Sequence, residues 1–290
     1  MSILRKCIAV CLLLCLASFA AAEEAPQEPL SILRVHQIAI GSADAYLITC
    51  EDTVVLVDCG RNTGTYRDSD KLFAYLEASG IDHVDIHFVT HWHEDHALNI
   101  QPLSEMYGRP ETVVYGPSRE LPEEYSPIPN GCYRQLRDGD RLTAGPLSFL
   151  CVGPEGDDRT GWQNVDSLNI LMTYGQHTFL FTGDWVDPSV RERYPEELNR
   201  ISVLSFPHHG LKPFCISQKT MRLLSPRVIL TPGNAEGDVK SYVSRECSVR
   251  VRPRYYCAHD GNVQVISDGI TLRTAYNVKP GEMPEGKIVP

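Results

Sequence analysis

The sequence has little that would mark it as fibrous, disordered or embedded in a membrane. It contains no repeat of fixed period and no low-complexity tract, and 42% of its residues are hydrophobic against 22% charged. This composition is that of an ordinary globular protein with an ample core. It excludes a disordered, collagen-like or coiled-coil chain and a polytopic membrane protein. The 290 residues suffice for one large domain or two small ones.

Basic residues are scarce relative to acidic ones. The chain has 27 Lys and Arg against 37 Asp and Glu, a formal net charge of −10, and without Arg5 and Lys6 the balance is 25 − 37 = −12. This argues against a protein that coats nucleic acid, although an acidic protein can bind a polyanion at a locally positive site. Nucleic acid is therefore a possible substrate of the protein, but we do not expect it as a stable binding partner.

The first 22 residues have the pattern of a secretory signal of bacterial type. Arg5 and Lys6 precede an apolar run over 7–20, and alanines then form an A-x-A-like cleavage site before Glu23. The run is shorter than the roughly 20 residues that span a bilayer, which disfavours a retained anchor. We expect a secreted or extracytoplasmic protein that has no membrane contact after cleavage.

The chain is therefore divided into a signal peptide over 1–22, a flexible lead-in over 23–31 and a single domain over 32–290. Of the 10 cysteines three lie in the signal, so seven remain, and no CxxC pair supports a cysteine zinc site. In an oxidising compartment an odd number leaves at least one thiol unpaired or pairing between chains. Neither the disulfide pattern nor the oligomeric state follows from the sequence.

Short β-rich runs separated by turn residues dominate the domain. The predicted strands are 35–40, 46–50, 54–58, 84–89, 147–152, 167–174, 178–182, 201–206, 228–231, 255–258, 263–266 and 271–274. Helices are predicted over 70–79, 188–198 and 218–224 from apolar spacing and a proline at a helix start. Two successive runs of strands and helices, each ending in acidic and histidine residues, predict two similar halves around one shared site.

The strongest functional signal follows the strand predicted over 84–89. The segment Thr90-His91-Trp92-His93-Glu94-Asp95-His96 places three histidines and two acids in one strand-to-helix turn. A solvated polar loop with chance histidines is the alternative. Imidazole and carboxylate groups that converge in one loop suit one or two zinc ions, and also manganese or iron. The sequence therefore predicts a metal site here.

This segment resembles the signature H-x-H-x-D-H of the metallo-β-lactamase-fold hydrolases, matched by His91, His93, Asp95 and His96. The resemblance implies an α+β fold, an αββα four-layer sandwich with helices on the outer faces of two mixed sheets. It implies that His91 and His93 bind one metal and that Asp95 and His96 bind a second.

Two further acids match the same family. The resemblance implies that Asp184, in Phe181-Thr182-Gly183-Asp184, bridges the two metals, and that Asp58 orients the metal loop. Within the family the chain resembles most the soluble domain of the DNA-uptake competence protein ComEC, without its membrane channel. The segments that carry this finer resemblance are 41–45, 164–167, 181–184, 203–210 and 261–265.

The pair His208-His209 supplies the expected final ligand. We prefer His208 as the metal ligand and His209 as a proton donor or phosphate contact. One departure from the wider family is that no histidine lies between His96 and His177, so the usual histidine of the intervening loop is missing. The first metal is then expected to be weakly held, completed by His208, or absent.

Four residues are candidate substrate contacts. Trp185 adjoins Asp184, and Lys212 follows the histidine pair. Arg250 and Arg252 alternate in the only dense basic stretch and would share one face of a strand, where arginines bind phosphate by charge-assisted hydrogen bonds. Core packing for the tryptophan and edge protection by charge for the arginines are equally good interpretations.

The chemistry implied is metal-assisted hydrolysis, in which Asp95 and Asp184 hold the metals and orient a water and His209 protonates the leaving oxygen. We expect an exported phosphodiesterase or nuclease that acts on a small or polymeric phosphoester. The alternatives are a lactonase, esterase or phosphorylcholine esterase on the same scaffold, and a noncatalytic exported metal-binding module.

Overall fold

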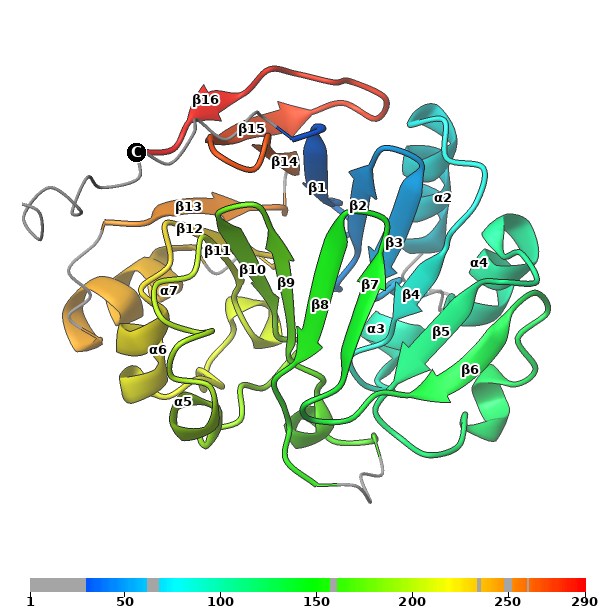
Figure 1. Ribbon diagram of the computed structural model, residues 1–290, viewed down its shortest axis with the longest axis horizontal. Coiled ribbons are helices and arrows are strands. Elements are labelled where there is room, and N and C mark those ends of the chain that lie inside the picture. Colours follow the sequence, from blue (N-terminus) through cyan, green and yellow to red (C-terminus); the bar gives the residue numbers. More distant parts are fainter. Residues whose placement is uncertain (1–29, 62–67, 157–160, 234–235, 248–251, 260) are drawn as a thin grey trace, which may run out of the picture.

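The computed structural model describes residues 30–61, 68–156, 161–233, 236–247, 252–259 and 261–290. Two β-sheets face each other, and helices lie on the outer side of each (Figure 1). The predicted αββα sandwich of two mixed sheets is thus confirmed. The predicted signal peptide and nearly all of the predicted lead-in lie outside the described residues.

Within the described residues the first sheet has nine strands. In spatial order they are β16 (Lys287–Ile288), β15 (Leu272–Val278), β14 (Asn262–Ser267), β1 (Leu33–Gln37), β2 (Tyr46–Cys50), β3 (Thr53–Val57), β4 (Ile86–Phe88), β5 (Val113–Gly116) and β6 (Cys132–Gln135). Strands β3 to β6 run parallel to one another, whereas the pairs from β16 to β3 are antiparallel.

The second sheet has seven strands in the described part of the chain. They are β13 (Arg254–Cys257), β12 (Val228–Thr231), β11 (Val203–Ser205), β10 (His177–Phe181), β9 (Ile170–Tyr174), β8 (Leu147–Cys151) and β7 (Arg141–Ala144). Strands β10 to β13 are parallel and the rest antiparallel. The helices are α2 (Asp68–Ala78), α3 (Glu94–Ala97), α4 (Ile100–Tyr107), α5 (Val190–Arg193), α6 (Gln218–Leu224) and α7 (Glu236–Ser241).

Alternation along the strands builds three apolar layers. Residues such as Leu33 and Val35 of β1 belong to the core between the sheets, where Phe88 of β4 meets Phe149 of β8 at 5.1 Å between ring centroids. Residues of the opposite strand faces join the helices in two outer layers. Because side chains alternate between the two faces of a strand, each sheet buries both of its faces.

Several elements differ from the sequence prediction. The helix predicted over 188–198 is reduced to α5, because Pro195 disfavours helical backbone at Tyr194, which adopts φ −128° and ψ 55°. The strand predicted over 35–40 is β1, which ends at Gln37. Helices α3 and α4 and strands β5 to β7 lie between 94 and 144, a region in which no element is predicted.

No helix in the described ranges is long and apolar enough to cross a membrane. No disulfide joins the cysteines that the structure describes.

Candidate metal centre

The predicted site residues follow the ends of four strands that come from both sheets. Asp58 follows β3, the segment 90–96 follows β4, Asp184 follows β10 and the pair His208-His209 follows β11. Ends of parallel strands lie at the same edge of a sheet, so these residues gather at one end of the sandwich. Buried side chains from distant parts of the sequence meet there.

The first group of possible ligands is His91, His93 and Asp184, whose ligand atoms lie within 4.8 Å of one another. His91 Nε2 is 3.0 Å from His93 Nδ1 and 3.6 Å from Asp184 Oδ2. His91 is fully buried and His93 half-buried. The group has the nitrogen and oxygen donors that zinc, manganese and iron accept.

The second group is Asp95, His96 and His209. His209 Nε2 lies 3.1 Å from Asp95 Oδ2, and His96 Nε2 lies 4.0 Å from Asp95 Oδ1. Asp184 Oδ1 is 3.2 Å from His96 Nε2 and 3.6 Å from His209 Nε2. The Asp184 carboxylate therefore lies between the two groups, one oxygen toward each.

In the second group, a carboxylate contacts the Nδ1 atom of each histidine. Asp58 Oδ2 is 2.8 Å from His96 Nδ1, and Asp44 Oδ1 is 2.9 Å from His209 Nδ1. Each contact leaves Nε2 as the nitrogen that faces the cluster. Thr90 fixes Asp58 in turn, because its amide and hydroxyl both donate to that carboxylate, each at 2.8 Å. Such outer contacts fix the tautomer and orientation of a metal-ligating histidine.

Asp44 is the residue that sequence reasoning missed. It is buried in the loop between β1 and β2, and its backbone NH donates to Asp95 O at 3.2 Å. The segment 41–45 contributes only to a family resemblance, and nothing in it indicates contact with a histidine 165 positions later.

Two buried atoms test whether these residues fit a metal. Among the described residues His96 Nε2 and Asp184 Oδ1 make no hydrogen bond, although they lie only 3.2 Å apart. Buried polar atoms without partners are rare because burying them costs free energy. An imidazole nitrogen and a carboxylate oxygen that face the same space are both good ligands, so the residues fit a divalent cation.

The electrostatics of the cluster agree with this. Burial, reinforced by charge on His96, lowers the pKa of His91 well below its ordinary value. Burial also acts to lower the pKa of His96, but the carboxylates of Asp184 and Asp58 outweigh it and raise this pKa well above its ordinary value. Burial is likewise outweighed at His209, where the carboxylates of Asp44 and Asp95 raise the pKa to about 10. Without a cation the cluster thus binds protons at neutral pH. Metal entry releases those protons, which makes metal affinity depend on pH.

The structure places His209, and not His208, beside Asp95 and His96. His209 is 3% exposed and its Nε2 faces Asp95, whereas His208 is half-buried and its Nδ1 faces Cys215 Sγ at 3.8 Å. Both histidines have left-handed backbone, with φ of +55° and +52°. This tight turn points the two neighbouring side chains in different directions, and the sequence alone does not say which one points inward.

The intervening segment, which has no histidine, supplies Ser167 instead. Its Oγ lies 3.4 Å from His91 Nδ1 and accepts a hydrogen bond from the Asp184 amide at 3.1 Å. Ser167 therefore positions two members of the first group. The motif Asn164-x-x-Ser167 in the sequence was the available signal for it.

Of the four predicted substrate contacts, the three that the structure describes are not brought together. Trp185 is half-buried beside Asp184. Lys212 Nζ forms an exposed ion pair with Asp238 Oδ1 at 2.8 Å, and Arg252 is exposed ahead of β13. Arg250 lies outside the described residues. No contact joins Lys212 or Arg252 to the His/Asp groups in the part of the chain that the structure describes.

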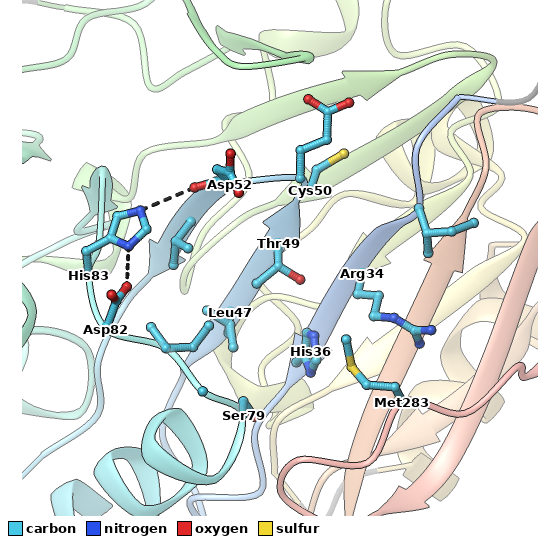
Figure 2. Close-up of a pocket in the computed structure, with 15 residues that line it drawn as sticks. Arg34, His36, Leu47, Thr49, Cys50, Asp52, Ser79, Asp82, His83 and Met283 are labelled. Carbon is cyan, nitrogen blue, oxygen red and sulfur yellow. Dashed lines mark hydrogen bonds and ion pairs between the residues drawn. The ribbon is translucent and has the colours of Figure 1, made fainter.

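A cavity of about 480 Å³ lies on the outer face of the nine-stranded sheet, away from these groups (Figure 2). Arg34 and His36 of β1 line one side of it, and His83 lies at the other, between Asp82 and Asp52. None of the predicted ligands lines this cavity. This cavity is therefore not the place where the His/Asp groups would carry out a reaction.

Comparisons with known proteins agree with the geometry. A family model, the metallo-β-lactamase superfamily, matches residues 39–212, more than half of the chain. No curated protein sequence matches the chain significantly. Among solved structures the fold is similar to the metallo-β-lactamase fold protein YhfI from Bacillus subtilis, with 18% identity, a TM-score of 0.52, and coverage of 78% of this chain and 96% of that one.

The fold is also similar to a diphosphatase from the PhnP family, with 14% identity, a TM-score of 0.51, and coverage of 81% of this chain and 99% of that one. The family match and the two His/Asp groups together support a metal-dependent hydrolase. The finer resemblance to ComEC has no counterpart among these matches. The chain belongs to the metallo-β-lactamase superfamily.

Proposed function

We propose that the protein is a metal-dependent hydrolase of phosphoric esters, with phosphodiesters as its substrates. The observation that carries the proposal is the position of Asp184, whose carboxylate lies between two His-containing ligand groups. Paired metal sites of this kind clamp both the attacking and the leaving oxygen of a phosphoryl group. The similarity to a structure described as a diphosphatase, and the resemblance to ComEC, support phosphorus over carbonyl substrates.

In this proposal His91, His93 and Asp184 would hold one divalent cation. Asp95, His96 and His209 would hold a second one, with the Asp184 carboxylate available to both. Such cations, zinc in our proposal, lower the pKa of a bound water to about 7 and neutralise charge on the phosphoryl oxygens. Other residues of the chain orient the residues that would bind the metals. Asp58 and Asp44 hold their histidines, and Ser167 holds the backbone of Asp184.

The proton for the leaving oxygen needs a group that is not a ligand. Both ring nitrogens of His209 are engaged, with Asp44 and with Asp95, so His209 is not available for this role. His208 is half-buried at the edge of the cluster and outside both ligand groups. We therefore assign the role of proton donor to His208 and the role of metal ligand to His209, the opposite of the assignment proposed from the sequence.

The proposal includes export. The basic residues, apolar run and alanines at the start of the chain support a signal peptide, and the finer relationship to ComEC supports an extracellular phosphodiester. Amino-terminal sequencing of the protein recovered from the medium or periplasm of an expressing bacterium tests this. We expect the mature chain to begin at Glu23.

The reaction is tested with bis(p-nitrophenyl) phosphate and the metal-free mature protein, titrated with zinc or with manganese. We expect turnover that rises with added metal and is lost in Asp184→Asn, since the amide cannot bridge two cations as a carboxylate does. The variant should keep its circular dichroism spectrum and melt cooperatively. Full activity in Asp184→Asn would contradict the site, and a metal-loaded wild type without activity would contradict the phosphoesterase.

A further inference from the structure

Polar side chains line the cavity on the outer face of the nine-stranded sheet (Figure 2). Arg34 and His36 are two residues apart on β1, so their side chains point to the same face of the sheet. The strand register places Thr49 of β2 directly opposite Arg34, and Leu47 directly opposite His36. Residues that are opposite in this way have Cβ atoms about 5 Å apart. The four residues therefore form one continuous part of the cavity lining.

The guanidinium of Arg34 is held by two hydrogen bonds that both use the same nitrogen. Its Nη1 donates to Gln264 Oε1 and to Pro284 O, each at 3.0 Å, and the side chain is half-buried. Among the described residues, Nε and Nη2 make no hydrogen bond and no carboxylate pairs with this arginine. Nε and Nη2 lie along one edge of the guanidinium, where two parallel N–H groups bind both oxygens of a carboxylate. This edge therefore fits a carboxylate.

His36 adds a buried hydrogen-bond donor next to Arg34. Burial, reinforced by the charge of Arg34, lowers the pKa of His36 to about 3, so its ring is neutral. His36 Nδ1 lies 2.8 Å from the hydroxyl of Tyr75, whose pKa burial raises to about 12 and which accepts a hydrogen bond from Gln264. The Tyr75 proton is therefore donated to Nδ1, and the ring proton of His36 lies on Nε2.

This Nε2 is one of the few buried polar atoms without a partner. His36 is 2% exposed, and its Nε2 makes no hydrogen bond among the residues that the structure describes. The hydroxyl of Thr49 likewise has no hydrogen-bond partner there. Buried donors are nearly always paired, because leaving one unpaired costs free energy. A ligand oxygen in the cavity would meet this requirement.

The rest of the cavity is apolar in the middle and acidic at the far end. Val54 and Ile81 line it together with the residues of β1 and β2. Figure 2 shows Asp52 and Asp82 on the side of the cavity away from Arg34. These carboxylates disfavour a second negative charge on a ligand. The lining therefore suits a molecule with one carboxylate and an apolar body.

We propose that this cavity binds a small monocarboxylate with an apolar body, of the kind that a short fatty acid represents. Arg34 binds the carboxylate through Nε and Nη2, and His36 Nε2 and the Thr49 hydroxyl donate to the same group. The apolar body lies on Leu47, Val54 and Ile81. A volume of about 480 Å³ is in the usual range for a small-molecule site. The site is separate from the His/Asp groups, so it does not depend on the proposed hydrolase.

Calorimetric titration of the zinc-loaded protein with three related molecules tests the ligand class. Hexanoate should bind roughly tenfold or more tightly than hexanol, which has the same apolar chain without the charge. Adipate adds a second carboxylate at the other end of the chain and should bind more weakly than hexanoate. Hexanol that binds as tightly as hexanoate would overturn the carboxylate site.

Variants of the cavity locate the binding. Arg34→Gln should weaken hexanoate roughly tenfold or more, and Thr49→Val, which keeps the shape of the side chain, should weaken it about fivefold. Arg273→Gln is the matched control, because Arg273 pairs with Ile266, which pairs with Arg34 on the same face, yet it lies outside the cavity. It should leave the Kd within about twofold of wild type. Unchanged affinity in both Arg34→Gln and Thr49→Val would overturn the proposal.

Removal of zinc separates this site from the metal groups, which could themselves bind a carboxylate. We expect the Kd for hexanoate to be the same in the zinc-loaded and the metal-free protein, since none of the predicted metal ligands lines the cavity. Binding that disappears with the zinc would place the carboxylate at the metal groups and overturn the cavity site. Binding that persists in a protein without hydrolase activity would leave the cavity site standing and count only against the proposed function.

Discussion

At the residue scale, the site depends on which nitrogen each histidine presents to the cluster. His96 and His209 each have Nδ1 against a buried carboxylate, so each presents Nε2. Among the described residues no carboxylate contacts the ring of neighbouring His208, whose Nδ1 faces Cys215 Sγ. A carboxylate behind the ring therefore marks the ligand more reliably than the order of the histidines along the chain.

This distinction predicts different outcomes for the two histidines. His209→Ala removes a ligand of the second group and should reduce bound zinc from about two ions per chain toward one, whereas His208→Ala should bind zinc as the wild type does. Metal analysis after dialysis against a weak chelator measures both. For activity, His208→Ala is expected to lower kcat by roughly 100-fold, the usual contribution of a general acid. Full zinc content in His209→Ala, or loss of zinc in His208→Ala, would reverse the assignment.

Site residues that lie close together in the sequence can be predicted as a group of metal ligands. His91, His93, Asp95 and His96 share one loop, so their motif is visible without a structure. Asp44 could not be given its role, because the contact depends on how the loop after β1 meets the turn after β11. Which of His208 and His209 points toward the cluster could not be predicted for a related reason, since left-handed backbone at both residues sets their directions and side-chain patterns do not encode it.

At the scale of elements, the turns that follow strands decide whether the ligands converge. Gly183, between β10 and Asp184, has φ +54°, and a Cβ there would lie 2.6 Å from Thr90 Oγ1 and 3.1 Å from Ser167 Cβ. Thr90 Oγ1 is also the donor that holds Asp58. The small size of Gly183 therefore lets the turn that carries Asp184 lie against Thr90 of the metal loop and against Ser167.

The effect of crowding at this turn can be separated from backbone strain. Gly183→Ala should lower the free energy of unfolding by about 3 kcal/mol, the sum of left-handed strain and overpacking, and should also weaken zinc binding. Gly80→Ala has a similar φ of +70° but nothing within 4 Å of the new Cβ, so it should cost only about 1 kcal/mol and leave zinc binding alone. Chemical denaturation and zinc titration of both variants provide the comparison. Equal losses in both would show that crowding is unimportant.

Elements were predictable where local signals and packing agree. β2, β12 and α6 have the predicted bounds, because turn residues flank the apolar runs that form them. The helix predicted after Pro188 runs past Pro195, whereas α5 ends at Arg193 because the residue before a proline disfavours helical backbone. β6 and β7 alternate between exposed and half-buried residues, which gives a weak apolar pattern, and they are held mainly by pairing with neighbouring strands.

At the scale of the whole molecule, burying both faces of each sheet also buries polar side chains that have no role at the metal groups. His87 of β4 pairs across the sheet with Leu56 and Val114, two members of the layer under the helices of the first half. It is 1% exposed, and neither ring nitrogen makes a hydrogen bond among the described residues. The neutral ring is tolerated there, whereas a charged one would be costly.

This burial makes stability depend on pH in a definite direction. Desolvation lowers the pKa of His87 from 6.5 to about 4, so the unfolded chain takes up its proton first as the pH falls. The free energy of unfolding is therefore unaffected by His87 above about pH 7, decreases as the pH drops below 6.5, and has lost about 3 kcal/mol near pH 4. His87→Leu fills the same space without a titratable group. Urea unfolding of the metal-free proteins should show that the free energy of unfolding of the variant, relative to that of the wild type, rises by about 3 kcal/mol between pH 7 and pH 4. If the two free energies change in parallel with pH, His87 is already protonated or solvated in the folded protein.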